Sequence, residues 1–188
     1  MAKFYTSDIH AFHKKIVSFT NRGAETTQEN HEVWLAKLWN SQVGHGDLTY
    51  ILGDVSFGDY KSTKLFLQFL NGQKIIIKGN HDRREDLDKL VKDGVIAAWY
   101  EYKEIKIMDK SVVLFHFPIS SWHKQSYGSW HLHGHSHGNF NGQGKILDVG
   151  IDSSYNHFGQ HKLFSEEDID EIMSLKDRFV ADNHRSQT

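Results

Sequence analysis

Cysteine is absent from this chain, and proline occurs only once. Without cysteine the protein has no disulfide and no thiolate zinc site, so any metal must bind through histidine, aspartate, glutamate, asparagine or backbone oxygen. That mixture of nitrogen and oxygen ligands suits manganese, iron, zinc, cobalt or nickel, and suits magnesium less well. Histidine, by contrast, is abundant, with 14 residues in the chain.

The sequence also lacks a strong charge of either sign and any long apolar run. The formal net charge is -2 with neutral histidine, so no overall field attracts nucleic acid or an anionic membrane. No apolar stretch has the length of a signal peptide or a membrane span, so we expect a cytoplasmic protein. The 188 residues suit one globular domain. We expect that domain over residues 1–181, followed by a frayed tail over 182–188.

The apolar residues recur with two different periods, which predict strands and helices in alternation. Strands are expected over residues 4–6, 48–52, 74–78, 101–108, 111–115, 130–133 and 145–149. Helices are expected over 28–42, around 65–70, after a capping box at 82–85 and after a second capping box at 165–168. The first half is thus a β-α-β-α-β series, and the second half is richer in adjacent strands. We predict an α/β fold in which two sheets pack face to face with helices outside.

Five short polar blocks fall at or near the predicted strand ends. In chain order they are Asp8-Ile9-His10, Gly53-Asp54, Gly79-Asn80-His81-Asp82, His116 and Gly134-His135-Ser136-His137. In an extended segment residues two apart project to the same side, so an Asp-x-His or His-x-His pair can grip one metal ion.

Each block by itself has an ordinary explanation. The aspartates could be turn residues, the histidine of the fourth block could belong to the core, and the last block could be a solvated loop. All five at strand ends, where α/β sheets gather their sites, favour one metal centre.

Taken together and in this order, the blocks resemble the motifs D-x-H, G-D, G-N-H-D, H and G-H-x-H of the calcineurin-like metallophosphoesterase superfamily. The resemblance covers Asp8 to His137, and it is nearest to the small single-domain bacterial and phage members. It implies a four-layer α/β/β/α sandwich with two mixed β-sheets. It also implies two divalent cations, of which manganese is our first choice. The implied ligands are Asp8, His10 and His137 for the first cation, Asn80, His116 and His135 for the second, and Asp54 as a bridge between them.

The resemblance gives His81 a different role, as the residue that stabilises the transition state and protonates the leaving oxygen. Positioned acid catalysis of this kind contributes about 10²–10⁴-fold in rate. Substrate contacts are expected from Arg83, Arg22 and His13, although Arg83 could equally be a solvated charge at a helix start. Asp82 is expected as a helix cap.

Other polar residues are given supporting or surface positions by the sequence. Asp148 and Asp152 flank Gly150 near a strand end and could support the ligands, whereas His31 is expected on the surface.

We therefore expect an enzyme that hydrolyses a small phosphodiester, such as a nucleotide diester. A phosphomonoesterase or phosphoprotein phosphatase is the alternative, but the second block reads G-D-V-S-F-G rather than the longer G-D-x-x-D-R-G of that branch. A third hypothesis is a non-catalytic scaffold on the same fold, which the presence of His81 disfavours. We expect no extended nucleic-acid surface and no membrane partner.

Overall fold

The structure of the protein is a computed structural model that describes residues 1–20, 22, 26–27 and 29–179. The tail expected over 182–188 lies outside these residues, as do the last two residues of the domain expected over 1–181. Among the described residues, no helix is both long enough and apolar enough to cross a membrane. The cytoplasmic location expected from the sequence stays a prediction.

The first sheet has five strands in the order β4-β3-β2-β1-β9. Its bounds are Lys3–Thr6 for β1, Leu48–Ile51 for β2, Gln73–Ile77 for β3, Ala98–Tyr100 for β4 and Phe164–Ser165 for β9. The four strands β1 to β4 run parallel, and β9 pairs antiparallel with β1 at the edge. Helices α1 (Ile16–Phe19) and α2 (His31–Asn40) follow β1, α3 (Tyr60–Phe69) follows β2, and α4 (Arg84–Lys92) follows β3. This β-α alternation therefore agrees with the pattern predicted for the first half.

The second sheet has four strands in the order β5-β6-β7-β8. They are Tyr102–Ile107 for β5, Lys110–Phe115 for β6, Trp130–His133 for β7 and Ile146–Asp148 for β8. The first two form an antiparallel hairpin, while β6, β7 and β8 are parallel. A 3-10 turn, η1 (Gln125–Tyr127), precedes β7, and helices α5 (Ile151–Phe158) and α6 (Glu166–Ser174) follow β8. Both sheets are thus mixed, as predicted.

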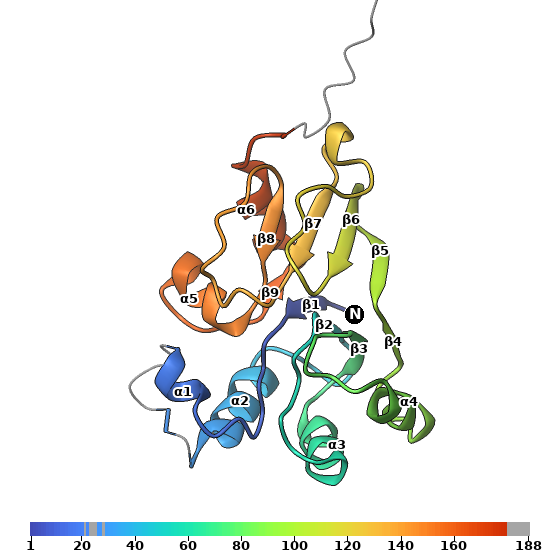
Figure 1. Ribbon diagram of the computed structural model, residues 1–188, viewed down its shortest axis with the longest axis vertical. Coiled ribbons are helices and arrows are strands. Elements are labelled where there is room, and N and C mark those ends of the chain that lie inside the picture. The colour runs from blue at the N-terminus through green and yellow to red at the C-terminus, as the bar shows by residue number, and fades with distance from the viewer. Residues whose placement is uncertain (21, 23–25, 28, 180–188) are drawn as a thin grey trace, which may run out of the picture.

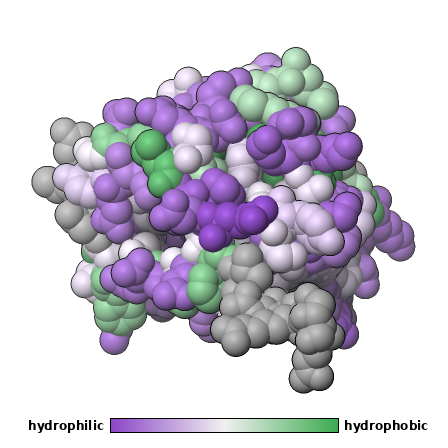
Figure 2. Space-filling model, turned by 90° about the horizontal axis from the view of Figure 1, so that it is seen from above, coloured by the Kyte–Doolittle hydropathy of each residue, from purple (hydrophilic) through white to green (hydrophobic). Residues whose placement is uncertain are grey.

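Two apolar clusters define the layers. One cluster joins the first sheet to α2, α3 and α4 and includes Trp39, Phe66 and Leu87. The other lies between the two sheets and includes Tyr5 and Trp130. Figure 1 shows α2, α3 and α4 on the outer side of the first sheet, with the second sheet and α6 on the opposite side. The predicted α/β/β/α arrangement is therefore confirmed. The face in Figure 2 is mostly hydrophilic, with its apolar residues in separate patches.

Some predicted details of the helices are wrong. The capping box expected at 82–85 does not form, because the N-cap of α4 is Arg83 and it makes no side-chain cap. Asp82 instead accepts three backbone N–H groups from the loops after β2 and β3. The second capping box is confirmed, since Ser165 and Asp168 cap α6 reciprocally. Helix α2 is shorter than the expected 28–42, of which Gln28 lies outside the described residues.

Candidate metal centre

The candidate ligands follow the carboxyl ends of strands from both sheets. Asp8, Asp54 and Asn80 come after β1, β2 and β3 of the first sheet, and His116 and His135 come after β6 and β7 of the second. Because parallel strands end at the same edge, each sheet gathers its own polar side chains there. The packing of the two sheets then brings both sets to one end of the sandwich.

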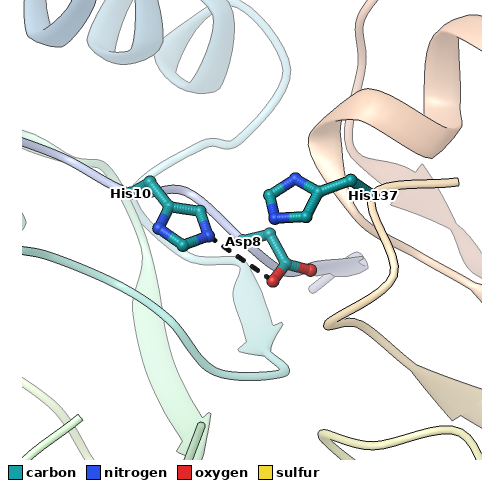
Figure 3. Close-up of side chains that lie close together, drawn as sticks. All are labelled: Asp8, His10 and His137. Atoms are coloured by element: carbon teal, nitrogen blue, oxygen red, sulfur yellow. Dashed lines mark ion pairs between the residues drawn. The ribbon is translucent and has the colours of Figure 1, made fainter. Parts of the chain in front are cut away.

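Two compact groups of side chains result. Asp8, His10 and His137 place one potential ligand atom each within 4.8 Å of the others, and Asp54, His116 and His135 do the same. Figure 3 shows the rings of His10 and His137 lying close to the Asp8 carboxylate, although they come from opposite halves of the chain. These groups of histidine and carboxylate have the composition that a divalent transition metal prefers.

Asn80 joins the second group. Its Oδ1 lies 3.0 Å from His116 Nε2 and 3.0 Å from His135 Nδ1. The structure therefore brings together all seven residues that the sequence nominated as ligands, while their binding of metal stays a prediction.

Asp54 belongs to the second group and also lies close to the first. Its Oδ2 is 3.9 Å from His10 Nε2 on one side and 3.7 Å from His116 Nε2 on the other. Its second oxygen, Oδ1, accepts the backbone N–H of His81 at 3.0 Å. One oxygen is thus fixed by the backbone, and the other faces histidines of both groups.

The two carboxylate oxygens of Asp8 also differ in their hydrogen bonds. Oδ2 accepts hydrogen bonds from Ser7 Oγ and from the backbone N–H of His135, whereas Oδ1 is buried and has no hydrogen-bond partner within the described part of the chain. Both ring nitrogens of His10 are buried and unpaired in the same sense. Buried polar atoms without partners are costly. A cation coordinated by them would remove that cost, so the donor set fits a metal ion.

The backbone at the site is held in an uncommon conformation. Asp8, His10, Asp54, His135 and His137 all have positive φ, between 49° and 69°. Left-handed conformations are tolerated by aspartate and histidine better than by most residues, but each still costs on the order of 1 kcal/mol. Such a cluster at one place indicates that the surrounding contacts, rather than local preference, fix these side chains.

Two glycines allow the loops to approach this closely. A Cβ added at Gly79 would lie 2.2 Å from Asp54 Oδ1, and a Cβ added at Gly134 would lie 2.6 Å from Asp8 Oδ2. Asp82 joins the loops after β2 and β3, because its carboxylate accepts the N–H groups of Gly79, Asp54 and Val55 at 2.8–3.0 Å. The glycines of the motifs therefore serve packing around the carboxylates.

Arg22 is not available for the substrate contact that the sequence analysis expected of it. Its side chain is buried, and its guanidinium donates to both oxygens of Asp152, to the carbonyls of Asp8 and Ile9, and to His31 Nε2, at 2.7–3.0 Å. All five N–H groups are used, so none remains for a substrate phosphate. Arg22 instead holds the chain around the first ligand in place.

His31, expected on the surface, is buried at the same place. It is 1% exposed and receives the Arg22 hydrogen bond. Burial, followed by the nearby Arg22 charge, lowers the pKa of His31 to about 3, so the ring is neutral and can accept.

Asp152 links Arg22 to the candidate metal group. It accepts a 2.7 Å hydrogen bond from His137 Nδ1, which fixes the orientation of that ring. Burial opposes ionisation of Asp152, but the His137 hydrogen bond and the Arg22 charge hold its pKa well below the usual range. Burial likewise opposes protonation of His137, yet the hydrogen bond to Asp152 raises its pKa. A carboxylate paired with a ligating histidine in this way increases the ligand's basicity.

Further hydrogen bonds fix other parts of the candidate site. His116 Nδ1 donates to the Leu52 carbonyl at 2.6 Å, which leaves Nε2 toward Asn80 and Asp54. Asp148, the second carboxylate flagged beside Gly150, accepts from Ser136 Oγ and from the Gly138 N–H in the last motif loop.

A cleft of about 660 Å³ adjoins these groups and is lined by His10, His137 and His81 among others. The His81 side chain is 47% exposed, with Nε2 4.0 Å from Asp54 Oδ2. His13 also lines the cleft. Arg83 lines a neighbouring hollow beside His81, where its exposed side chain lies 3.8 Å from Asp86. Catalysis by His81 and substrate contacts by His13 and Arg83 stay predictions.

No known family profile matches the chain. The Gene 66 protein of Mycobacterium phage L5 is 29% identical over 160 residues, which cover 71% of this chain and 76% of the phage protein. In fold, the chain is similar to the protein of unknown function AQ665 from Aquifex aeolicus, with a TM-score of 0.65 at 22% identity over 91% of this chain and 98% of that one. The uncharacterized protein MJ1445 of Methanocaldococcus jannaschii is 33% identical over 142 residues, covering 74% of this chain and 72% of that protein. The chain therefore belongs to the same family as the uncharacterized protein MJ1445.

Proposed function

We propose that the protein is a metal-dependent phosphoesterase that hydrolyses a small phosphodiester. The observation that carries this proposal is the pair of aspartate–histidine groups that Asp54 connects, the first of which borders a cleft that also exposes His81. The order of the motifs, which resembles the calcineurin-like metallophosphoesterases, supports the same reading.

The two groups would hold two divalent cations, with manganese as the first candidate and iron, zinc, nickel, cobalt or magnesium as others. When bound, such cations polarise a phosphoryl oxygen and lower the pKa of a water molecule, which then becomes a nucleophile at neutral pH. The protein's own contribution is to hold the ligands in a fixed arrangement before substrate arrives. The hydrogen bonds of Asp152, Asp82 and Leu52 to the motif loops serve this purpose.

His81 is the residue that we propose to act on the substrate. Its backbone is fixed by the hydrogen bond to Asp54, while its ring remains half exposed at the cleft. A protonated ring there can donate to the leaving oxygen as its bond to phosphorus breaks, which avoids release of an alkoxide. In the hydrolysis, water adds to phosphorus, and one ester oxygen leaves as an alcohol.

Hydrolysis of phosphomonoesters or phosphoproteins is the alternative activity. The block Gly53-Asp54-Val55-Ser56-Phe57-Gly58 favours the diesterase, because it lacks the longer form typical of the phosphoprotein phosphatases. A non-catalytic scaffold is disfavoured, since His81 and all seven ligand positions are present. The proposed partner is thus a small phosphoester in the cytoplasm, without an extended nucleic-acid surface or a membrane.

A substrate panel with defined metals tests the activity. We expect manganese-stimulated, EDTA-sensitive hydrolysis of bis-p-nitrophenyl phosphate with a higher kcat/KM than for p-nitrophenyl phosphate, a phosphoserine peptide or duplex DNA. A preference for the phosphoserine peptide would assign the protein to the phosphatases. Efficient cleavage of duplex DNA would contradict the small-substrate proposal, because that substrate needs a long basic track to bind.

A further inference from the structure

The cleft beside the candidate metal centre has one wall made of rings. Phe19, His13, Phe57 and His81 form a continuous row, with ring centroids 6.1 Å, 4.4 Å and 4.6 Å apart in that order. Phe57 is 41% exposed and Phe19 is 69% exposed, although an aromatic side chain in the core would normally be covered. The row therefore offers apolar ring surface that leads to His81.

The lining of the cleft also includes polar side chains. Among them are Asn139, Asn156 and Tyr155, from the last motif loop and from α5. The two asparagines donate through Nδ2 to the carbonyls of His137 and Gly138. Within the described part of the chain, no hydrogen bond reaches either asparagine Oδ1, so both oxygens can accept one from a ligand.

We infer that this cleft binds a nucleobase, carried by the nucleoside arm of the phosphodiester whose hydrolysis is proposed above. A base presents a flat π-face, which stacks on aromatic side chains, and an edge of donors and acceptors, which an amide can bind. A linear alkyl arm would use neither feature. The cleft volume of about 660 Å³ lies within the ~300–1,000 Å³ of small-molecule sites.

Phe57 is the residue that determines this preference. Its ring centroid lies 4.6 Å from that of His81 and 5.2 Å from that of His10, a candidate ligand. A base stacked on Phe57 would therefore place its attached phosphate next to the candidate metal groups. This geometry makes base binding productive, since it positions the scissile bond rather than only retaining the substrate.

The test compares two substrates that share a leaving group and differ only in the other arm. These are thymidine 5′-(p-nitrophenyl phosphate) and ethyl p-nitrophenyl phosphate, each assayed with the manganese-loaded full chain. We expect kcat/KM to be at least about tenfold higher for the thymidine ester. Stacking of one base is worth about 5- to 150-fold, so Phe57→Ala should bring that ratio close to one, and Phe57→Trp should restore it.

Both substrates use the same site, so any effect of Phe57→Ala on His81 changes both kcat/KM values alike and cancels in their ratio. Phe69→Ala is the matched control, since Phe69 is 74% exposed on α3 and lies outside the cleft. Equal kcat/KM for the two substrates in the wild type, or an unchanged ratio in Phe57→Ala, would overturn the inference while leaving the phosphodiesterase proposal intact.

If neither ester is hydrolysed, a measurement of binding affinity still distinguishes the nucleobase site from the proposed hydrolysis. Calorimetry then compares thymidine 5′-phosphate with ethyl phosphate on the manganese-loaded wild type and Phe57→Ala. Tighter binding of the nucleotide that Phe57→Ala abolishes would uphold the base site and refute the hydrolytic proposal. Equal binding of the two phosphates would refute the base site as well.

Discussion

At the scale of single residues, the candidate site depends on side chains that support the candidate ligands from behind. Arg22 connects the Asp8 and Ile9 carbonyls to Asp152, and Asp152 holds His137. The sequence flagged Asp152 only by its place near a strand end. It could not predict the contact with Arg22, because the two residues are 130 positions apart and a buried arginine in a polar loop has no local pattern.

Asp152→Asn is expected to weaken metal binding. Asparagine keeps the shape of the side chain and can still accept from His137, but it removes the negative charge that makes the ring a stronger ligand. Loss of such an outer partner typically costs 10- to 100-fold in metal affinity, so we expect a decrease of about that size for manganese by calorimetry. Asp59→Asn, at the exposed N-cap of α3, is the control and should leave affinity unchanged. Equal affinities for wild type and Asp152→Asn would show that the pair has no role in binding.

His81→Asn is expected to separate binding from chemistry. The backbone N–H of residue 81, which holds Asp54, remains in this variant, so both metal groups should stay intact. The variant loses the proton donor, so turnover of a diester with an alcohol leaving group, such as thymidylyl-(3′→5′)-thymidine, should fall by about 10²–10⁴-fold. Metal content measured on the same preparation provides the control. Wild-type turnover in a metal-replete variant would exclude His81 as the acid.

At the scale of elements, two similar local patterns behave differently. Ser165 and Asp168 form the reciprocal cap that their spacing predicts. Asp82 and Glu85 have equivalent spacing, yet Asp82 is drawn away by three backbone N–H groups from other loops. Capping is a local preference worth about 1 kcal/mol, so several buried hydrogen bonds override it. The short strand β4 was not predicted for a similar reason. Its three residues form a strand through pairing with β3, and not through a local pattern.

The turn between α3 and β3 gives a pH-dependent prediction. Lys74 is buried and donates to the Leu70 and Gly72 carbonyls in this turn. Burial lowers its pKa to about 8, below the value of ~10.4 for an unfolded lysine. Between these values the unfolded chain holds a proton that the folded chain has released, so raising the pH stabilises the fold. Below about pH 8 both states are protonated, and this contribution to the pH dependence vanishes.

The measurement is the free energy of unfolding of metal-free protein by urea at pH 7.5 and pH 9.5. The wild type should gain about 1–2 kcal/mol relative to Lys74→Met over this interval, whatever the absolute stability of the variant. Lys61→Met, at an exposed position of α3, should follow the wild type. Parallel curves for wild type and Lys74→Met would contradict the lowered pKa.

At the scale of the whole molecule, periodicity could predict the two sheets, but only the resemblance of the motifs predicted how their ends meet. Strand periodicity and glycine-bearing turns predict which residues lie at strand ends, and all five blocks do follow strands or lie in the loops after them. Sheet order and packing arise from contacts between distant segments, such as those of Tyr5 and Trp130 in the inter-sheet cluster. The resemblance of the motifs predicted that Asp8 meets His137 and that Asp54 meets His116, whereas periodicity alone could not, and the structure brings these residues together.

This joining predicts that metal stabilises the whole fold, because each candidate group takes ligands from both sheets. Without cations, the buried carboxylates of Asp8 and Asp54, and the ring nitrogens of His10, which have no hydrogen-bond partner among the described residues, oppose the packing that brings them together. A ligand that binds only the folded state at 100 times its Kd adds ~2.7 kcal/mol. For a chain of this size that corresponds to a rise in Tm of about 5–10 °C, which EDTA should reverse.

Asp54→Ala distinguishes this effect from nonspecific binding of manganese. Asp54 faces both groups, so its removal should abolish most of the rise in Tm and reduce the two bound ions expected by elemental analysis. Removing the buried charge should also relieve part of the strain in the metal-free protein, whose Tm should then fall little or even increase. Asp59→Asn should retain the full response to manganese. A rise in Tm that survives Asp54→Ala would place the stabilising cations elsewhere in the molecule.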